Sequence, residues 1–137
     1  MGRHPCPPGW GVYLTEGYAK GSAVHPSDPD LEDLSARYVE WHHQRGNDLA
    51  TGLRLAELLR TAGLDIVDHQ GRYHIFTPTP GFRPPSWAAR DALAAAGLAT
   101  SDDVERWRSA LDRLDGVADR VTVFVPLFFA VGRRPAS

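Results

Sequence analysis

The sequence has a single cysteine, Cys6, and only one lysine against fourteen arginines. One cysteine excludes an internal disulfide framework and a cysteine-rich zinc site. The formal net charge is −2, which argues against a basic nucleic-acid interface or a polybasic membrane-binding patch. The excess of arginine over lysine, with abundant alanine, leucine and glycine, suggests a GC-rich bacterial genome.

Long hydrophobic segments are also lacking. The run Val121–Val131 is apolar apart from Thr122 and carries no charge, but it is too short for a bilayer, which takes roughly 20 residues. Met1–Trp10 lacks the pattern of a signal peptide. The sequence therefore predicts a cytoplasmic protein, and its 137 residues predict one domain over 1–137.

The run Val121–Val131 is the strongest local signal. Its β-branched and aromatic residues favour a strand, and its near-continuous hydrophobicity predicts a central strand with both faces covered by helices. Pro126 cannot donate to a sheet hydrogen bond. We therefore expect a regular strand at Leu127–Arg133, joined through a break to Val121–Val125.

Shorter patterns complete an α/β arrangement. The other expected strands are Val12–Thr15 and Leu64–His69, the latter turning at Gln70–Arg72 into Tyr73–Phe76. The expected helices begin at Ser27 or Asp28, at Asn47 or Asp48, at Ser86 and at Ser101, and the first three end near Arg45, Gly63 and Gly97. Gly17–Pro29 is expected to be a loop. The order predicts helices on a small sheet of three to four strands.

Polar and aromatic residues gather after the first expected strand. Loops at the carboxyl ends of strands line ligand crevices in open α/β sheets, which makes Glu16, Tyr18 and His25 pocket candidates. A solvated loop without a ligand explains these three residues equally well. The helix that follows adds further candidates: Tyr38, Trp41, His42, Arg45 and Asp48. Tyr38 and Trp41 also fit a core-facing stripe, together with Leu31 and Leu34.

Metal and nucleophile patterns are weak. His42 and His43 are adjacent and point about 100° apart on a helix, so they do not readily ligate one metal. His69 and His74 approach each other only if a hairpin forms, and surface histidines are the simpler interpretation. No metal site is predicted, and neither a Gly-x-Ser-x-Gly motif nor a phosphate-binding loop is present.

Four segments together resemble a known family. Pro8–Glu16 is similar to the segment that begins the fifth strand of class I S-adenosylmethionine-dependent methyltransferases. Gly52–Gly63 resembles the helix that follows this strand, and Leu64–His69 resembles the sixth strand. Phe124–Pro135 resembles the seventh strand with its Val-Gly-Arg-Lys/Arg-Pro exit.

The resemblance covers only the C-terminal half of that family's fold. It implies a partial Rossmann-like methyltransferase fold with a small mixed sheet, in which the C-terminal strand lies antiparallel between the fifth and sixth strands. Residues 77–120 would form a helical insert. The family's glycine-rich cofactor turn, Gly-x-Gly-x-Gly, is absent from this chain. S-adenosylmethionine is therefore implied by resemblance but is not expected to bind this chain alone.

The resemblance also implies roles. Glu16 and His42 would be catalytic, by orienting or deprotonating a hydroxyl of a small-molecule substrate. Substrate would be bound by Tyr18, His25, Trp41, Arg45 and Asp48. The exposed first strand would pair with a protein partner that supplies the cofactor-binding half, or with a second copy. Three possibilities stay open: a methyltransferase half or truncated remnant, a non-catalytic stabilising module, and a stand-alone enzyme acting on a natural-product intermediate.

Overall fold

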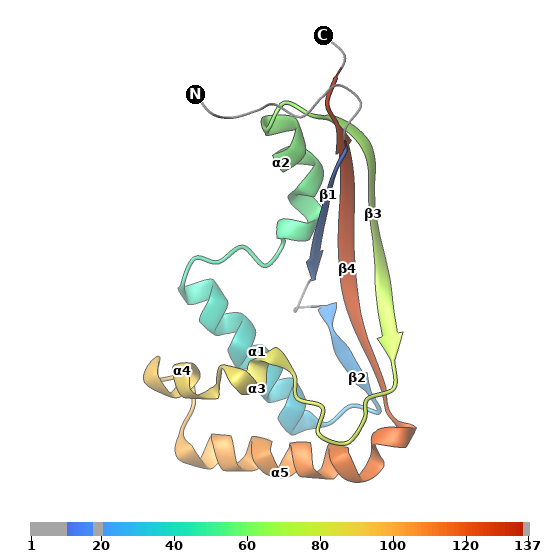
Figure 1. Ribbon diagram of the computed structural model, residues 1–137. Helices are drawn as coiled ribbons and strands as arrows, with labels where there is room; N and C mark the ends of the chain where they lie inside the picture. The colour runs from blue at the N-terminus through green and yellow to red at the C-terminus, as the bar shows by residue number, and fades with distance from the viewer. Residues whose placement is uncertain (1–10, 18–20, 136–137) are drawn as a thin grey trace. The chain divides into compact units, whose positions relative to one another are not determined.

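The C-terminal apolar run forms the central strand of an open sheet. The computed structural model describes residues 11–17 and 21–135. In it, β4 (Thr122–Arg133) pairs with β1 (Gly11–Gly17), β2 (Ala23–His25) and β3 (Asp65–Phe76). The fold is α/β, as predicted, and Figure 1 shows β4 between β1 and β3. The predicted mixed sheet is wrong, because every other strand is a neighbour of β4 and runs antiparallel to it.

β4 passes through Pro126 without interruption, so the predicted break in the strand is wrong. A different change occurs there. Before the proline, Val121, Val123 and Val125 pack into one hydrophobic cluster, whereas after it Phe128 and Ala130 pack into another. The core-facing positions therefore change from odd to even numbers across Pro126, the residue that cannot donate to a neighbouring strand.

The chain forms two compact units, and β3 and β4 contribute residues to both. The described residues of unit 1 are 11–17, 50–73 and 126–135. Those of unit 2 are 21–49 and 74–125.

Unit 1 contains β1, most of β3, the greater part of β4 and one short helical segment. A 3₁₀ turn, η2 (Thr51–Arg54), leads into α2 (Leu55–Thr61). The predicted helix start at Asn47 or Asp48 is wrong, since the helical segment begins at Thr51 and has no side-chain cap. Its predicted end is confirmed, because Gly63 has a φ of 87° and follows the last turn. Leu55 and Leu59 pack on Ala130 in the core.

β3 is one strand rather than a hairpin, so the turn predicted at Gln70–Arg72 is wrong. Gly71 has a packing role instead. A Cβ atom on Gly71 would lie 2.9 Å from the Cδ1 and Cε1 atoms of Phe128, and a Cβ atom on Gly52 would overlap the same ring. The absence of side chains at these two glycines thus makes room for Phe128.

Unit 2 is mainly helical. The side chain of Asp28 caps α1 (Pro29–Gln44) by accepting from the Asp30 amide at 2.9 Å, which confirms one of the two predicted starts. Three further helices follow: α3 (Pro85–Ala88), α4 (Arg90–Ala95) and α5 (Ser101–Val117), the last continued by the 3₁₀ turn η3 (Ala118–Arg120). Strand β2 lies within the segment predicted to be a loop, and its three residues are too few to show a pattern.

Two clusters form the core of unit 2. Leu34 of α1, Leu93 of α4 and Trp107 of α5 are fully buried together. Leu111 and Leu114 of α5 pack against the beginning of β4. In the sequence, Val104, Trp107, Leu111 and Leu114 recur at helical spacing, which predicts one apolar face, and the structure confirms this face as part of the core.

A charged network joins α1 to α5 beside this core. Arg106 donates to Asp30 at 2.7 Å, to Asp33 at 2.8 Å and to Asp103 at 2.9 Å. These hydrogen bonds raise the pKa of Arg106, and Arg106 likewise helps to lower the pKa of Asp30. Arg37 adds a second guanidinium between Asp33 and Asp103.

A separate ion pair, between Arg83 and Asp115, predicts that the protein loses stability at acid pH. Arg83 donates to both oxygens of Asp115, at 3.0 and 2.9 Å, and the Gly81 amide donates at 2.8 Å. Together these donors lower the pKa of Asp115 to about 2. The carboxyl is less acidic in the unfolded chain, with a pKa of about 3.9, so the stabilisation is complete above that pH and is lost as the pH falls towards 2.

We expect Asp115→Asn to be less stable than the native chain at neutral pH and to lose less stability between about pH 4 and 2. Urea unfolding at several pH values, followed by circular dichroism, measures this. Asp119→Asn is the control, because its carboxylate is almost fully exposed and 4.0 Å from Arg120. Parallel losses of stability in Asp115→Asn and the native chain over this range would contradict the prediction.

Candidate functional site

The last turns of α1 carry a cluster of aromatic rings. Tyr38, Trp41 and His42 are spaced so that their side chains share one side of the helix. The His42 ring meets Tyr38 edge-on at 4.5 Å between centroids and lies 4.8 Å from Trp41. Trp41 also packs partly against the Leu34 and Trp107 cluster. Trp41 therefore belongs both to the edge of the core and to this surface cluster.

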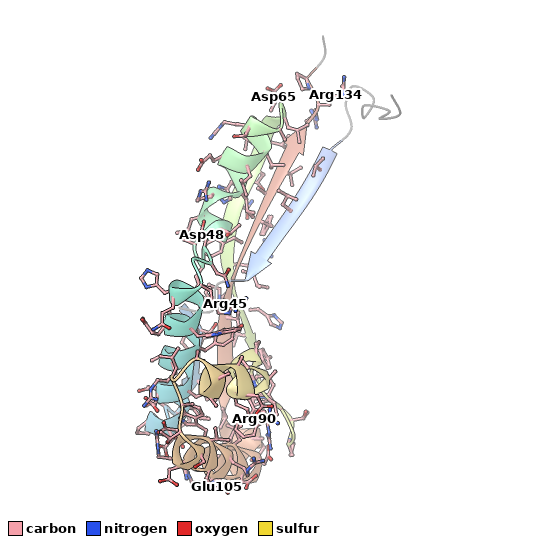
Figure 2. The ribbon with its side chains drawn as sticks, turned by 90° about the vertical axis from the view of Figure 1, so that its left-hand side faces the viewer. Arg45, Asp48, Asp65, Arg90, Glu105 and Arg134 are labelled. Atoms are coloured by element: carbon pink, nitrogen blue, oxygen red, sulfur yellow. The ribbon has the colours of Figure 1, made fainter. Side chains whose placement is uncertain are left out.

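A cation covers part of the cluster. The guanidinium of Arg45, the residue that ends α1, lies 5.0 Å from the centroid of the Trp41 ring. Figure 2 shows Arg45 at this end of the helix, with Asp48 in the segment that follows. Arg45 is exposed, and its charge also suits the negative end of the helix dipole.

His42 is held by a residue that was expected only as a helix cap. The Nδ1 atom of His42 lies 2.8 Å from the Nδ2 atom of Asn47. When the Asn47 amide donates, Nδ1 accepts and Nε2 carries the proton, so His42 presents an N–H donor from Nε2. When the amide is turned over, Nδ1–H donates and Nε2 is left as a base. Either way, Nε2 is the nitrogen left for a ligand.

The predicted site residues are only partly brought together. The structure places Trp41, His42 and Arg45 in one cluster, with the exposed Asp48 three residues after Arg45. His25 is exposed on β2, where it pairs with Thr122. Glu16 belongs to unit 1, opposite Phe128 in the strand register, and its side chain lies outside the description. Tyr18 lies outside the described residues altogether.

Other kinds of site have less support. Within residues 11–17 and 21–135, no three histidine, cysteine or acidic side chains are grouped to hold a metal ion. An open depression of about 290 Å³ is lined by Pro26, Val117, Arg120 and Val121. It contains none of the predicted site residues.

Comparison with known proteins does not assign this chain to a family. No protein-family model matches the sequence, and no curated protein matches it significantly. The resemblance to methyltransferases therefore stays a prediction from the sequence segments. Among the described residues, no helix is both long enough and apolar enough to cross a membrane.

The cluster at the end of α1 offers a surface on which a ligand can bind rather than a pocket that encloses it. It offers a half-buried aromatic surface, one histidine nitrogen and one guanidinium, all at the surface of unit 2. Such groups suit stacking against a planar ligand and hydrogen bonding to an anionic or hydroxyl group. The sequence analysis included Tyr38, Trp41 and His42 among the candidates but treated Asn47 only as a helix cap, because its contact with His42 crosses the end of the helix.

Proposed function

We propose that this chain is the C-terminal part of a methyltransferase-like protein that acts on a small molecule together with a partner. The partner supplies the Rossmann-like strands that bind S-adenosylmethionine. The observation that carries the proposal is the order β1–β4–β3, with β4 antiparallel in the middle and α2 between β1 and β3 in sequence. The sequence resemblance implies this order for the fifth, seventh and sixth strands.

The proposed roles follow from chemistry that the cluster offers. Methyl transfer needs the acceptor atom, the methyl group and the sulfur to be aligned, and a base helps when the acceptor is a hydroxyl. In this proposal His42 orients or deprotonates the acceptor through Nε2, with Asn47 fixing the ring. Trp41 supplies an apolar wall, and Arg45 attracts a negative group. Glu16, which belongs to unit 1, stays a prediction from the sequence.

The experiment compares the chain alone with its complex. The chain is tagged in its native host, its stable complex is purified, and S-adenosylhomocysteine is titrated calorimetrically into the complex and into the isolated chain. We expect the complex to bind in the micromolar range, about −8 kcal/mol, and the isolated chain to bind far more weakly. A stable complex without affinity for the cofactor product would overturn the proposal.

The complex also permits a matched pair of variants. His42→Ala should slow methyl transfer by about 100-fold or more, the usual contribution of a general base. His43→Ala is the control, because His43 is the exposed neighbour on the same helix turn. Equal rates for the two variants would remove His42 from the proposed mechanism.

A second candidate function is a non-catalytic module that stabilises another enzyme. The exposure of His25, Arg45 and Asp48 favours it, because catalytic groups usually act in a site that excludes water. This candidate predicts a stable complex whose cofactor affinity and activity do not change when His42 is replaced.

A further inference from the structure

β1 is an edge strand of the sheet. β1 stands at the end of the strand order and is hydrogen-bonded to β4 along one side. Within the part of the chain that the structure describes, no strand pairs with its other side. An unpaired edge presents a row of N–H and C=O groups that can pair with another chain.

β1 also lacks the features by which proteins protect such edges. Residues Gly11–Gly17 contain no proline and no lysine, and their register with β4 is unbroken from Gly11 opposite Arg133 to Gly17 opposite Leu127. Proline, lysine and bulges are the usual means of blocking an edge. A second strand can therefore approach β1 along its full length.

β3, which also pairs with β4, likewise contains no proline and no lysine, but it differs from β1 in charge. Half-buried and exposed residues alternate along it from Asp65 to Asp68, and the residues from Gln70 to Ile75 are all exposed. Asp65, Asp68 and Arg72 also place charge on this strand. Charged side chains on an edge strand oppose the addition of another strand, and β1 carries only Glu16, so β1 is the favoured edge.

The side of β1 that faces α2 is incompletely covered. Val12 and Leu14 pack on the Leu55 and Leu59 cluster, but both are only half-buried. In the same unit, Leu58 of α2 is 39% exposed. A strand added beside β1 would remove apolar surface of Val12 and Leu14 from water, which adds a hydrophobic contribution to the backbone hydrogen bonds.

The sequence of β1 can pair with itself without opposing like charges, because Glu16 is its one charged residue. We propose that a second copy of this chain pairs with β1 in an antiparallel register centred on Leu14. This register places Leu14 opposite Leu14 of the second copy, Val12 opposite Glu16, and Gly11 opposite Gly17. No two residues of like charge face each other. The two-fold symmetry puts α2 of both copies on the same side of a continuous sheet and closes the assembly at two chains.

The dimer adds a regulatory step to the proposed function, and only this regulatory step rests on that function. The partner that supplies the cofactor-binding strands is proposed to use the same edge, so the dimer and the active complex exclude each other. Self-association would then keep the chain inactive, and its open edge covered, until the partner is present. The existence of the dimer is independent of methyl transfer.

Cysteine cross-linking of the full chain tests the register. All variants carry Cys6→Ser, and disulfides are formed by mild oxidation and read on a non-reducing gel. Leu14→Cys should cross-link efficiently, because directly opposed residues of antiparallel strands have Cα atoms about 4.5–5.5 Å apart, within disulfide range. Val12→Cys should cross-link poorly, since its two copies are offset by four residues, about 13 Å.

A mixture of Val12→Cys and Glu16→Cys chains restores cross-linking in this register, and it tests the proposal even if Leu14→Cys fails to fold. Sedimentation equilibrium of the native chain should give twice the monomer mass at tens of micromolar. A monomeric mass would overturn the dimer, as would equal cross-linking of Val12→Cys and Leu14→Cys. A monomer that still forms the cofactor-binding complex would leave the proposed function standing.

Discussion

Replacing Trp107 with alanine should lower the free energy of unfolding by about 3–5 kcal/mol, the largest loss expected for a single substitution in this chain. Trp107 is fully buried between Leu34 and Leu93. Its Nε1–H donates to the Asp33 carboxylate at 3.1 Å. The alanine variant loses this donor and leaves a cavity between three helices, which surrounding side chains fill only in part.

Trp107→Phe separates the two contributions. The smaller ring keeps part of the packing and removes the N–H donor, so we expect a loss of about 2 kcal/mol. Leu53→Ala is the surface control, because Leu53 is 58% exposed and its substitution should change stability by less than about 1 kcal/mol. Urea unfolding followed by far-ultraviolet circular dichroism gives all three values. An alanine variant as stable as the Leu53 control would show that Trp107 does not hold the helices together.

Gly52→Ala should destabilise unit 1 by about 2–3 kcal/mol, which is large for the addition of one methyl group. The new Cβ atom would overlap the Phe128 ring, which also lies close to Gly71 on β3. The ring therefore has little room to move away. Either Phe128 or the backbone of η2 must shift, and either movement disturbs the Leu55 and Leu59 packing.

A double-mutant cycle identifies the cause. Phe128→Leu shortens the side chain that the methyl group meets, so Gly52→Ala in that background should cost at least about 1 kcal/mol less than in the native chain. Gly116→Ala is the matched control, because Gly116 has open space around it within α5 and alanine favours a helix by about 0.5–1 kcal/mol. Strictly additive losses for the Gly52 and Phe128 substitutions would rule out the overlap as the cause.

The sequence predicted those elements whose signal is local. The apolar run predicted β4, and Gly63 predicted the end of α2. The spacing of Trp107, Leu111 and Leu114 predicted the core face of α5. Each follows from periodicity or from a residue with a single conformational use. The helical spacing of Tyr38 and Trp41 likewise fits the half-buried positions that both residues occupy on α1.

The errors arose where tertiary contacts decide the local structure. Gly71 reads as a turn residue, but in the fold it gives space to Phe128 in a distant strand. β2 exists because three residues find partners at Thr122–Phe124, which local sequence does not encode. Asn47 reads as the cap of a helix that begins four residues later, and it instead holds His42.

The strand β4 also determines when the protein can fold during synthesis. It follows every other described element in the chain, yet one apolar cluster in each unit contains its residues. The ribosome releases chains from the N-terminus, and domains usually fold in that order. Here neither unit can complete its core before residues 121–132 emerge. The two units must therefore mature together, and until then the exposed apolar faces of α2 and α5 are potential sites for chaperones.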